Sequence, residues 1–400
     1  MSQSPVYQRP SSAEWSYWES ELEWKSRFHV EFPTDVLKAS YDFVVIGGGF
    51  TGLSAAYHAS LMHPTAKIAV LDKYHPPIGA STRNAGFACI GTVGEFLADA
   101  VLEQKEVIWD RMKTRWDGLE LLRKTLGDEA IGFEPSGGYE LFTSKEAYSK
   151  VEPHIKECEQ ALKERIGGSE WYTPTRVNDY QAIFMPNEGC LQPAKAWQSL
   201  AQKCRERSIT LSWGTNVSEI DDEVGSVKVV LEPGQLHDVI TASSVVVATN
   251  AFSSTISSSE FDPSTVQPGR GMVWVTQPLS ELKWRGTFHA EEGYIYFRSV
   301  GENRLLLGGA RHKDRITEET HHFGINETIA HFLKEYMRDV LKISPEYIAY
   351  QWSGIMGFTS TKNPVCIANL NGNVIHAVGL SGMGVALSSE LGRRAARLLE

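Results

Sequence analysis

Long hydrophobic runs are missing from this 400-residue sequence, and no apolar stretch approaches the ~18 residues that a membrane-spanning helix needs. Basic residues do not dominate either. There are 39 lysines and arginines against 49 aspartates and glutamates, and the net charge of −10 argues against nucleic acid or an anionic membrane as a partner. Residues 1–30 are acidic and aromatic and lack the apolar core of a signal peptide. We therefore expect a soluble, cytoplasmic protein.

Cysteine is also scarce, with 5 residues scattered along the chain and no C-x-x-C pair. This pattern predicts no cysteine-based metal site and suits a reducing compartment. Repeats and low-complexity tracts are absent as well, which excludes solenoids and propellers. With 42% hydrophobic residues, the chain is long enough to bury a full core as two domains or one large one.

A glycine-rich turn follows the first strongly apolar run. Residues 43–46 read as a buried parallel strand, and Gly47, Gly49 and Gly52 then match the dinucleotide-binding fingerprint. The first glycine allows a tight turn, the second lets the backbone approach a pyrophosphate, and the third lets helix and strand pack closely. A helix is predicted from about Thr51 to Met62, with its N-terminus facing the phosphates.

A second apolar strand, residues 68–71, delivers Asp72 at 20 residues past Gly52 (72 − 52). A carboxylate at this place accepts hydrogen bonds from an adenosine ribose and disfavours a 2′-phosphate, so NADP does not fit. The cradle alone leaves open whether the dinucleotide is NAD or FAD. Three further stretches bear on that choice, namely Gly79–Phe87, the Ala248–Asn250 end of an apolar strand, and Gly379–Gly384 before a C-terminal helix.

Together, VVIGGGFTGLSAA, GASTRNAG, GCLQPAKAWQSL, VVVATNAF, YIYFR, RLLLGGARH, WSGIMGFT and GLSGMGVALSSELG resemble the D-amino-acid oxidase-like (DAO) family of FAD-dependent amine and amino-acid oxidoreductases. In motif texture the chain is most similar to the γ-glutamylputrescine oxidase, glycine oxidase and sarcosine oxidase group. The resemblance implies FAD held without a covalent bond, because residues 355–359 carry no cysteine where some relatives have the linking one. It implies that the cofactor contacts are Gly47, Gly49, Phe50, Thr51, Gly52, Asp72, Lys73, Ala80, Ser81, Arg83, Asn84, Ala85, Gly86, Val217, Ala248, Thr249, Asn250, Gly354, Met356, Gly379, Ser381, Gly382, Met383 and Gly384.

The glycines of residues 379–384, before the C-terminal helix, are also explained by flavin chemistry. Negative charge develops near N1 and the C2 oxygen of a reduced flavin, and N–H groups at a helix start stabilise it. The competing interpretation is a loop whose glycines serve only a tight turn before a packing helix.

The fold class expected is α/β plus α+β, with a Rossmann-like FAD-binding domain interleaved with a substrate domain built on a large mixed sheet. The expected division gives an N-terminal appendage at 1–40, an FAD-binding domain from 41–95, 186–265 and 346–400, and a substrate domain from 96–185 and 266–345. In the appendage, Trp15, Trp18 and Leu22 share a helical stripe that either packs on its own domain or docks a partner. Single helices are expected over 96–127 and from Ser144 to Gly167.

Arg298 is the candidate for binding a substrate carboxylate, because guanidinium is a fork-shaped cation and the residue matches the carboxylate-binding arginine of glycine-oxidase-like relatives. If residues 294–298 form a strand, its period of two puts Tyr294 and Tyr296 on the same face. The alternative is a surface arginine paired with a nearby acid. Met272, Trp274 and Thr276 form a second alternating set that lines either the pocket or the plain core.

The resulting hypothesis is an FAD-dependent oxidoreductase that oxidises the C–N bond of a small amine or amino acid by hydride transfer to flavin N5, with hydrolysis of the imine. Its partners are then a small-molecule substrate and an electron acceptor, either O2 or a carrier. Three alternatives stay open: a quinone- or carrier-linked dehydrogenase, a noncatalytic flavin-binding protein, and a nicotinamide dehydrogenase.

Overall fold

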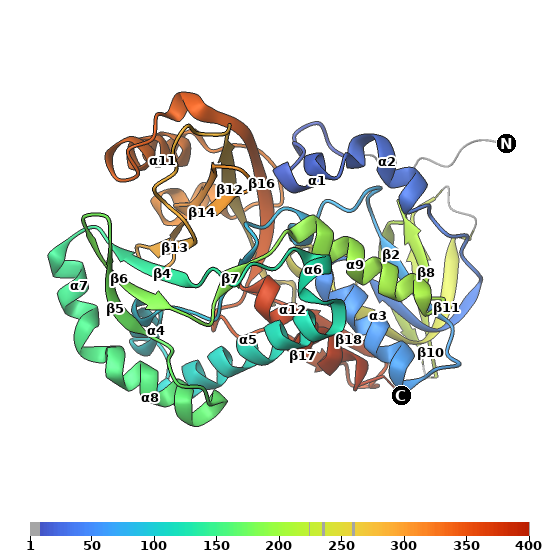
Figure 1. The fold of residues 1–400 in the computed structure, drawn as a ribbon. Coiled ribbons are helices and arrows are strands. Elements are labelled where there is room, and N and C mark those ends of the chain that lie inside the picture. Colours follow the sequence, from blue (N-terminus) through green and yellow to red (C-terminus); the bar gives the residue numbers. More distant parts are fainter. Residues whose placement is uncertain (1–8, 224, 234–236, 258–260, 400) are drawn as a thin grey trace.

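Two eight-stranded sheets organise the chain in a computed structural model that describes residues 9–223, 225–233, 237–257 and 261–399 (Figure 1). The first sheet holds the glycine-rich turn, and the second holds Arg298. The predicted class, α/β plus α+β with a large mixed sheet, is confirmed.

The first sheet is parallel at its centre, with antiparallel strands at one edge and in a side branch. In spatial order it contains β17 (Val365–Ala368), β18 (Val374–Val378), β11 (Val239–Val247), β1 (Ser40–Ile46), β2 (Ile68–Asp72) and β8 (Thr210–Trp213), with β10 (Ser226–Leu231) and β9 (Val217–Glu223) branching from β11.

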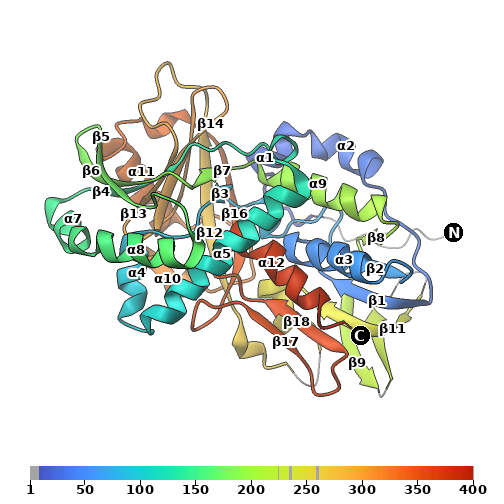
Figure 2. The same ribbon diagram turned by 60° about the horizontal axis from the view of Figure 1, so that its bottom comes forward.

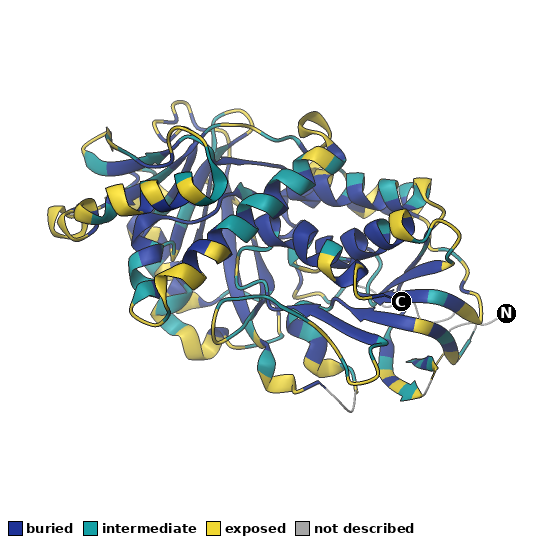
Figure 3. Cartoon of the chain, turned by 90° about the horizontal axis from the view of Figure 1, so that it is seen from below, coloured by how far each residue is buried: buried dark blue, intermediate teal, exposed yellow. Residues whose placement is uncertain are grey.

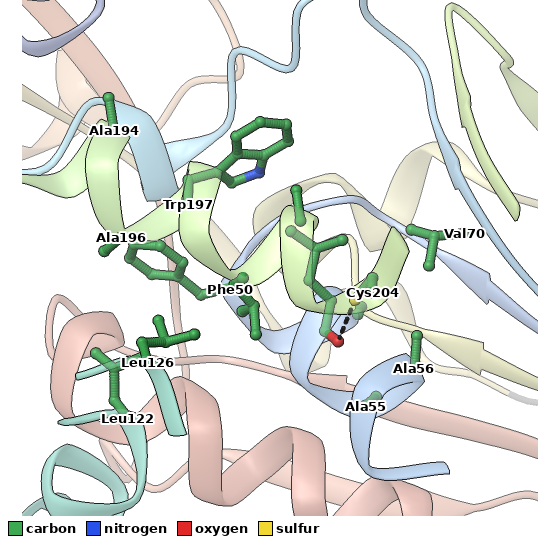
Figure 4. Packing of buried hydrophobic residues seen from close by; sticks show 14 of the residues in the cluster. Phe50, Ala55, Ala56, Val70, Leu122, Leu126, Ala194, Ala196, Trp197 and Cys204 are labelled. Carbon is green, nitrogen blue, oxygen red and sulfur yellow. Dashed lines mark hydrogen bonds between the residues drawn. The ribbon is translucent and has the colours of Figure 1, made fainter. Parts of the chain in front are cut away.

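Strand β1 is buried on both faces, as expected for the middle of a parallel sheet. Phe43 and Val45 belong to the cluster formed with the helices, and Val44 and Ile46 belong to the cluster formed with β9 and β10. The helices on the first face are α3 (Phe50–Met62), α9 (Pro193–Glu206) and α12 (Gly384–Ala396), and Figure 4 shows α9 packed on α3. The thiol of Cys204 on α9 donates to the Leu53 carbonyl of α3 across 3.3 Å.

The second sheet is antiparallel except for one parallel pair, β13 with β4. Its spatial order is β16 (Ile348–Phe358), β12 (Gln267–Thr276), β15 (Arg304–Gly309), β14 (Ile295–Val300), β13 (Thr287–Ala290), β4 (Gly138–Phe142), β6 (Tyr180–Met185) and β5 (Thr173–Val177). A short pair, β3 (Phe87–Ala88) with β7 (Gly189–Cys190), completes the strands.

The two faces of the second sheet have different roles. Met272 and Trp274 pack with Phe297 and the apolar face of α11 (Glu327–Asp339) in one buried cluster. They therefore lie on the opposite face from Tyr296, whose ring contacts Phe87 of β3. The suggestion that Met272, Trp274 and Thr276 line the pocket is wrong, because the pleat turns the first two toward α11, and the hydroxyl of Thr276 accepts from the Leu305 N–H.

Two helix predictions need correction. Residues 96–127 form two helices, α4 (Val93–Ala100) and α5 (Lys105–Leu126), and Val101 between them is exposed. Ser144 caps a helix as predicted, but α7 (Lys145–Val151) gives way to a short 3₁₀ turn, Glu152–His154, before α8 (Ile155–Ile166), because Pro153 interrupts the α-helical hydrogen bonds. Two short helices are α6 (Asp128–Ile131) and α10 (Arg315–Glu318).

Helix α5 packs with residues of both sheets, because Met112 shares a buried cluster with Met185 of β6, and Leu122 shares another with Val45 of β1. Figure 2 shows it running beside α12, and the two helices are in contact. Figure 3 shows strands that are mostly buried, while α5 has buried and exposed faces. Among the described residues, no helix combines the length and the apolar character needed to cross a membrane.

The N-terminal segment packs on its own chain. It forms α1 (Tyr17–Glu21) and α2 (Trp24–Glu31), and both Trp18 and Trp24 are 1% exposed. Tyr17 and Trp18 contact Tyr350 and Trp352 of β16, and Figure 1 shows α1 next to that strand. The packing interpretation of this stripe is therefore confirmed for Trp18.

The expected division into domains stays a prediction, with one boundary displaced. The expected cofactor-domain segment 346–400 includes β16, which pairs with β12 in the second sheet. We therefore propose that the last cofactor-domain segment begins after Phe358.

Candidate flavin and substrate site

The glycine-rich turn has the geometry that its sequence predicts. Gly47 leaves β1 at φ +107°, and a Cβ there would lie 2.7 Å from the Ala248 carbonyl oxygen. A Cβ on Gly52, in the first turn of α3, would lie 1.9 Å from the Gly47 carbonyl oxygen. The first position therefore needs a backbone that favours glycine, and the second needs the absence of a side chain.

Asp72 ends β2 beside this turn. Its two carboxylate oxygens accept from the N–H groups of Gly48 (2.8 Å) and Tyr74 (3.1 Å). Burial raises the pKa of Asp72 from 3.8 to about 6, and these hydrogen bonds oppose that rise. Each oxygen still has a lone pair for a further donor, such as a ribose hydroxyl. Lys73 follows, half-buried, with its ammonium 5.8 Å from the centre of the Tyr74 ring.

Three segments far apart in the sequence meet at the start of α3. The Phe50 N–H donates to Ser81 Oγ across 2.8 Å, which ties the turn to the Gly79–Phe87 loop. Asn250, at φ 51°, accepts through Oδ1 from the Gly379 N–H at 2.9 Å, and Ala248 N donates to Ile46 O at 2.8 Å. The predicted cofactor residues of the front, middle and tail are therefore adjacent.

The tail loop is held against β16 as well. The Ser381 N–H donates to the Gly357 carbonyl at 2.8 Å, and Ser381 Oγ accepts from Thr359 N at 3.3 Å. Gly382 lies at φ +82°, and α12 then begins at Gly384 after Met383.

Within the Gly79–Phe87 loop, polar side chains shape the backbone. Asn84 donates through Nδ2 to the carbonyls of Ala80 and Ser81 (3.0 Å each) and accepts from the Gly86 N–H at 2.8 Å. Arg83 is fully buried and donates to the carbonyls of Ser353 (2.7 Å) and Glu14 (2.6 Å). Burial lowers its pKa to about 10. The hydrogen bonds of both side chains go to backbone groups, and Arg83 also lies 3.5 Å from the Glu19 carboxylate. We expect cofactor contact from this loop to come from Ser81, the backbone and the small residues, Ala80, Ala85 and Gly86.

The other predicted cofactor residues lie at the margins of this group. Val217 starts β9 with its side chain in the buried cluster under the first sheet, so only its backbone is free to face a ligand. Gly354 and Met356 both lie on β16. Gly354 is close to Arg83, and Met356 pairs with Gly269 of β12. The hydroxyl of Thr249 bonds to Ser253 Oγ at 3.0 Å.

Arg298 lies on β14 with only 4% of its surface exposed. Its Nη2 donates to the Leu191 carbonyl at 3.0 Å, and a Cβ on Gly86 would lie 2.9 Å from the same nitrogen. Its Nε is buried without a hydrogen-bond partner, and no described carboxylate forms an ion pair with it. The alternative of a surface arginine paired with an acid is wrong, because Glu291 instead pairs with His312 and Lys313.

Tyr294 and Tyr296 separate in the structure. Tyr296 lies beside Arg298 on β14 and contacts Phe87, with ring centres 5.6 Å apart. Tyr294 precedes the strand, is 43% exposed, and packs on His312. The predicted three-residue face is therefore wrong for Tyr294, because the strand starts one residue later than expected.

Residues 42–398 match the family model described as DAO, FAD dependent oxidoreductase. The chain belongs to the DAO family. This confirms the predicted family and decides for FAD over a nicotinamide cofactor. The DAO-family chain is therefore an FAD-dependent enzyme that oxidises amines or amino acids.

Known relatives cover nearly the whole chain. Monomeric sarcosine oxidase from Arthrobacter sp. (strain TE1826) is 26% identical over 397 residues, which is 90% of this chain and 93% of the relative. Gamma-glutamylputrescine oxidoreductase from Escherichia coli (strain K12) is 25% identical over 399 residues, or 92% of this chain and 86% of the relative. The crystal structure of glycine oxidase from Geobacillus kaustophilus shares the fold, with a TM-score of 0.71, 19% identity, and coverage of 90% of this chain and 95% of that one.

Two helix N-termini at the glycine-rich turns fit FAD. Gly49 precedes α3 and Met383 precedes α12, and neither residue provides a side-chain cap. The hydroxyl of Thr51 is also buried with no partner among the described residues. The Phe50 N–H at the start of α3 donates to Ser81 Oγ, and the N–H groups that follow it suit a pyrophosphate. Those at the start of α12 suit the electron-rich edge of a flavin. We expect these groups, together with Asp72, to hold the cofactor of the DAO-family enzyme.

Sequence reasoning missed His289 and Glu188 near Tyr296. His289 lies opposite Tyr296 in the β13–β14 register and contacts Phe87. Its Nε2 is 3.9 Å from the Glu188 carboxylate, and burial lowers the pKa of His289 to about 4 while raising that of Glu188 to about 8. Neither residue lies in a recognisable motif, and only the pairing of distant strands brings them here.

Proposed function

We propose that this DAO-family enzyme oxidises the C–N bond of a small amine that carries a carboxylate, and that Arg298 binds the carboxylate. One contrast carries the proposal. Of the five buried arginines among the described residues, four form ion pairs with carboxylates, and Arg298 does not. A buried cation without a counterion is unfavourable, and an anionic substrate group would supply what the protein leaves out.

In this reaction the protein mainly has to position the substrate against the cofactor. FAD, when bound, takes the two electrons and the hydrogen of the C–H bond next to the amine. Loss of this hydride leaves the substrate as a protonated imine, and water then converts it to a carbonyl compound and a protonated amine. Because a neutral amine needs no strong acid or base for this step, the chain's own work is to orient the substrate and exclude water. Arg298 orients the carboxylate, and Tyr296 and Phe87 form an apolar wall.

The names of the relatives support the same substrate class. Sarcosine and glycine both carry a carboxylate next to the amine-bearing carbon, and γ-glutamylputrescine is an N-substituted polyamine that also carries a carboxylate. We therefore place N-substituted amino acids and modified polyamines ahead of free D-amino acids. A noncatalytic flavin-binding protein would have no use for a buried, unpaired arginine in this place.

The test is anaerobic reduction of the purified holoenzyme by matched pairs of amines. Sarcosine against sarcosinamide, and glycine against glycinamide, differ mainly in the carboxylate. We expect the carboxylate member to bleach the flavin absorbance near ~450 nm at a lower concentration than its amide. Equal reduction by both members would remove Arg298 from substrate binding, and reduction by neither member of any pair would contradict the proposed substrate class. Reoxidation by O2 against a quinone then separates oxidase from dehydrogenase.

A further inference from the structure

The N-terminal segment reaches the side of Arg298. We propose that Trp18 is a positioning residue for Arg298, and that residues 9–21, which we name the N-terminal clamp, belong to the substrate site. This inference rests on the proposed function, because it assigns the clamp to the carboxylate subsite.

The indole of Trp18 faces the guanidinium directly. Arg298 Cζ lies 4.9 Å from the centre of the Trp18 ring, within the range of a cation–π contact. The ring is 1% exposed, and its Nε1 donates to the Asn84 carbonyl at 2.8 Å. Trp352 of β16 stands edge-on to it, with ring centres 6.4 Å apart, and donates to the neighbouring Arg83 carbonyl at 2.8 Å. Trp18 is therefore fixed in orientation.

Arg298 is held between this ring and a backbone carbonyl. Its Nη2 donates to Leu191 O, and the next residue, Gln192, donates through Nε2 to the Trp18 carbonyl at 3.3 Å. The guanidinium is thus located by the Leu191 carbonyl, the Trp18 π face and the neighbouring Cys190 thiol, whose pKa burial raises, so none of the three carries a negative charge. Its remaining N–H groups stay available for a planar anion such as a carboxylate.

Glu19 anchors the clamp to the cofactor loop. This carboxylate is fully buried and accepts from the Ser16 N–H (2.8 Å), from Arg9 Nη2 (2.6 Å) and from Thr82 Oγ1 (3.2 Å). It also lies 3.5 Å from Arg83, and the hydroxyl of Ser16 donates to the Thr82 carbonyl at 3.0 Å. One helical turn therefore ties the loop expected at the flavin to the arginine expected at the substrate.

The experiment compares Trp18→Leu, Trp18→Phe and Trp24→Leu as holoenzymes. Trp24 is the matched control, because it is equally buried in the same segment but packs on Phe28 and Trp197 rather than on Arg298. Propionate and its neutral isostere propionamide are titrated while the flavin absorbance is recorded. The readout is the ratio of the two dissociation constants, which general loosening of the structure would not change selectively.

We expect Trp18→Leu to weaken propionate binding by about 10–30-fold, the value of a desolvated cation–π contact, with propionamide unchanged. Trp18→Phe keeps a weaker π face and should lose about threefold. This milder variant keeps the test decisive if Trp18→Leu fails to fold or to retain FAD. Trp24→Leu should keep the wild-type ratio.

The variant Arg298→Ala distinguishes the proposed carboxylate site from the proposed positioning role of Trp18. If this variant keeps the wild-type preference for propionate, or if the wild type itself has none, the carboxylate site is wrong. If Arg298→Ala abolishes the preference while both Trp18 variants keep it, the carboxylate site stands and the positioning role of Trp18 is overturned.

Discussion

Replacing Arg298 by methionine separates function from stability, because the arginine is buried without a counterion. Methionine has a similar length and carries no charge. The change removes one hydrogen bond to a carbonyl, worth about 2 kcal/mol for a charged donor, and one ring contact worth about 2 kcal/mol. It also relieves the several kcal/mol that an unpaired buried cation costs. These effects oppose each other, so we expect the free energy of unfolding to stay within about 2 kcal/mol of the wild-type value.

Activity should respond very differently to the same change. Loss of a charge-assisted contact to a substrate carboxylate costs about 3 kcal/mol, which corresponds to roughly a 150-fold fall in kcat/KM. The matching amide substrate should lose much less. Flavin content should not change, because Arg298 contacts the loop beside the cofactor through Gly86 and none of the glycine-rich turns.

The assay pairs thermal unfolding of the holoenzyme, followed by flavin fluorescence, with steady-state kinetics on the carboxylate and amide. Arg270→Met is the matched control, since Arg270 is also buried on a strand of the second sheet but bonds to the buried carboxylate of Glu318 at 2.6 Å. Breaking that pair should cost about 3–5 kcal/mol. If Arg298→Met were equally destabilising and left the carboxylate-to-amide ratio intact, Arg298 would be a structural residue.

Three further results are expected. Gly52→Ala should lower the ratio of FAD to purified protein and destabilise the fold by about 2–3 kcal/mol, because its Cβ would meet the Gly47 carbonyl at 1.9 Å; full flavin occupancy would contradict this. Asn250→Ala should weaken FAD binding about tenfold, measured by flavin release, since Gly379 loses its acceptor; unchanged affinity would rule out that link. The pKa of Glu188 is raised from 4.5 to about 8, so the folded state keeps a proton that the unfolded chain releases, and stability falls as pH rises through that window. Glu188→Gln should therefore gain up to about 5 kcal/mol relative to wild type between pH 5 and pH 8 in urea unfolding, and a constant difference would refute the shift.

The glycine-rich turns were predictable because their constraints are local. Gly47 and Gly52 must satisfy a turn and a close contact within six residues of each other, and the strand and helix on either side carry their own patterns. Asn250 was placed with them through the family resemblance, and the structure supplies the physical reason in its bond to Gly379.

The substrate side of the site could not be predicted in the same way, because it depends on contacts between segments that are far apart in the sequence. The alternation in residues 272–276 is the same whether its face meets a ligand or α11, and only the packing of α11 decides. The register of β14 excludes Tyr294 by one residue, and β16 joins the second sheet by pairing with β12. His289 comes to Tyr296 from β13, and Trp18 comes to Arg298 from the N-terminal segment.

The surroundings of Arg298 show why an aromatic ring suits this place better than an acid. A carboxylate from the protein would stabilise the buried cation but would occupy the same N–H groups that a substrate carboxylate needs, and would repel it. The Trp18 ring and the Leu191 carbonyl attract the guanidinium without a net charge. Glu188 lies against Gly138 of β4. Gly138 pairs with Thr287 of β13, and Thr287 pairs in turn with Arg298 of β14. Burial raises the pKa of Glu188 to about 8, so this carboxyl group stays neutral below that pH, and in the proposed site the charge of Arg298 is left for an anionic ligand to compensate.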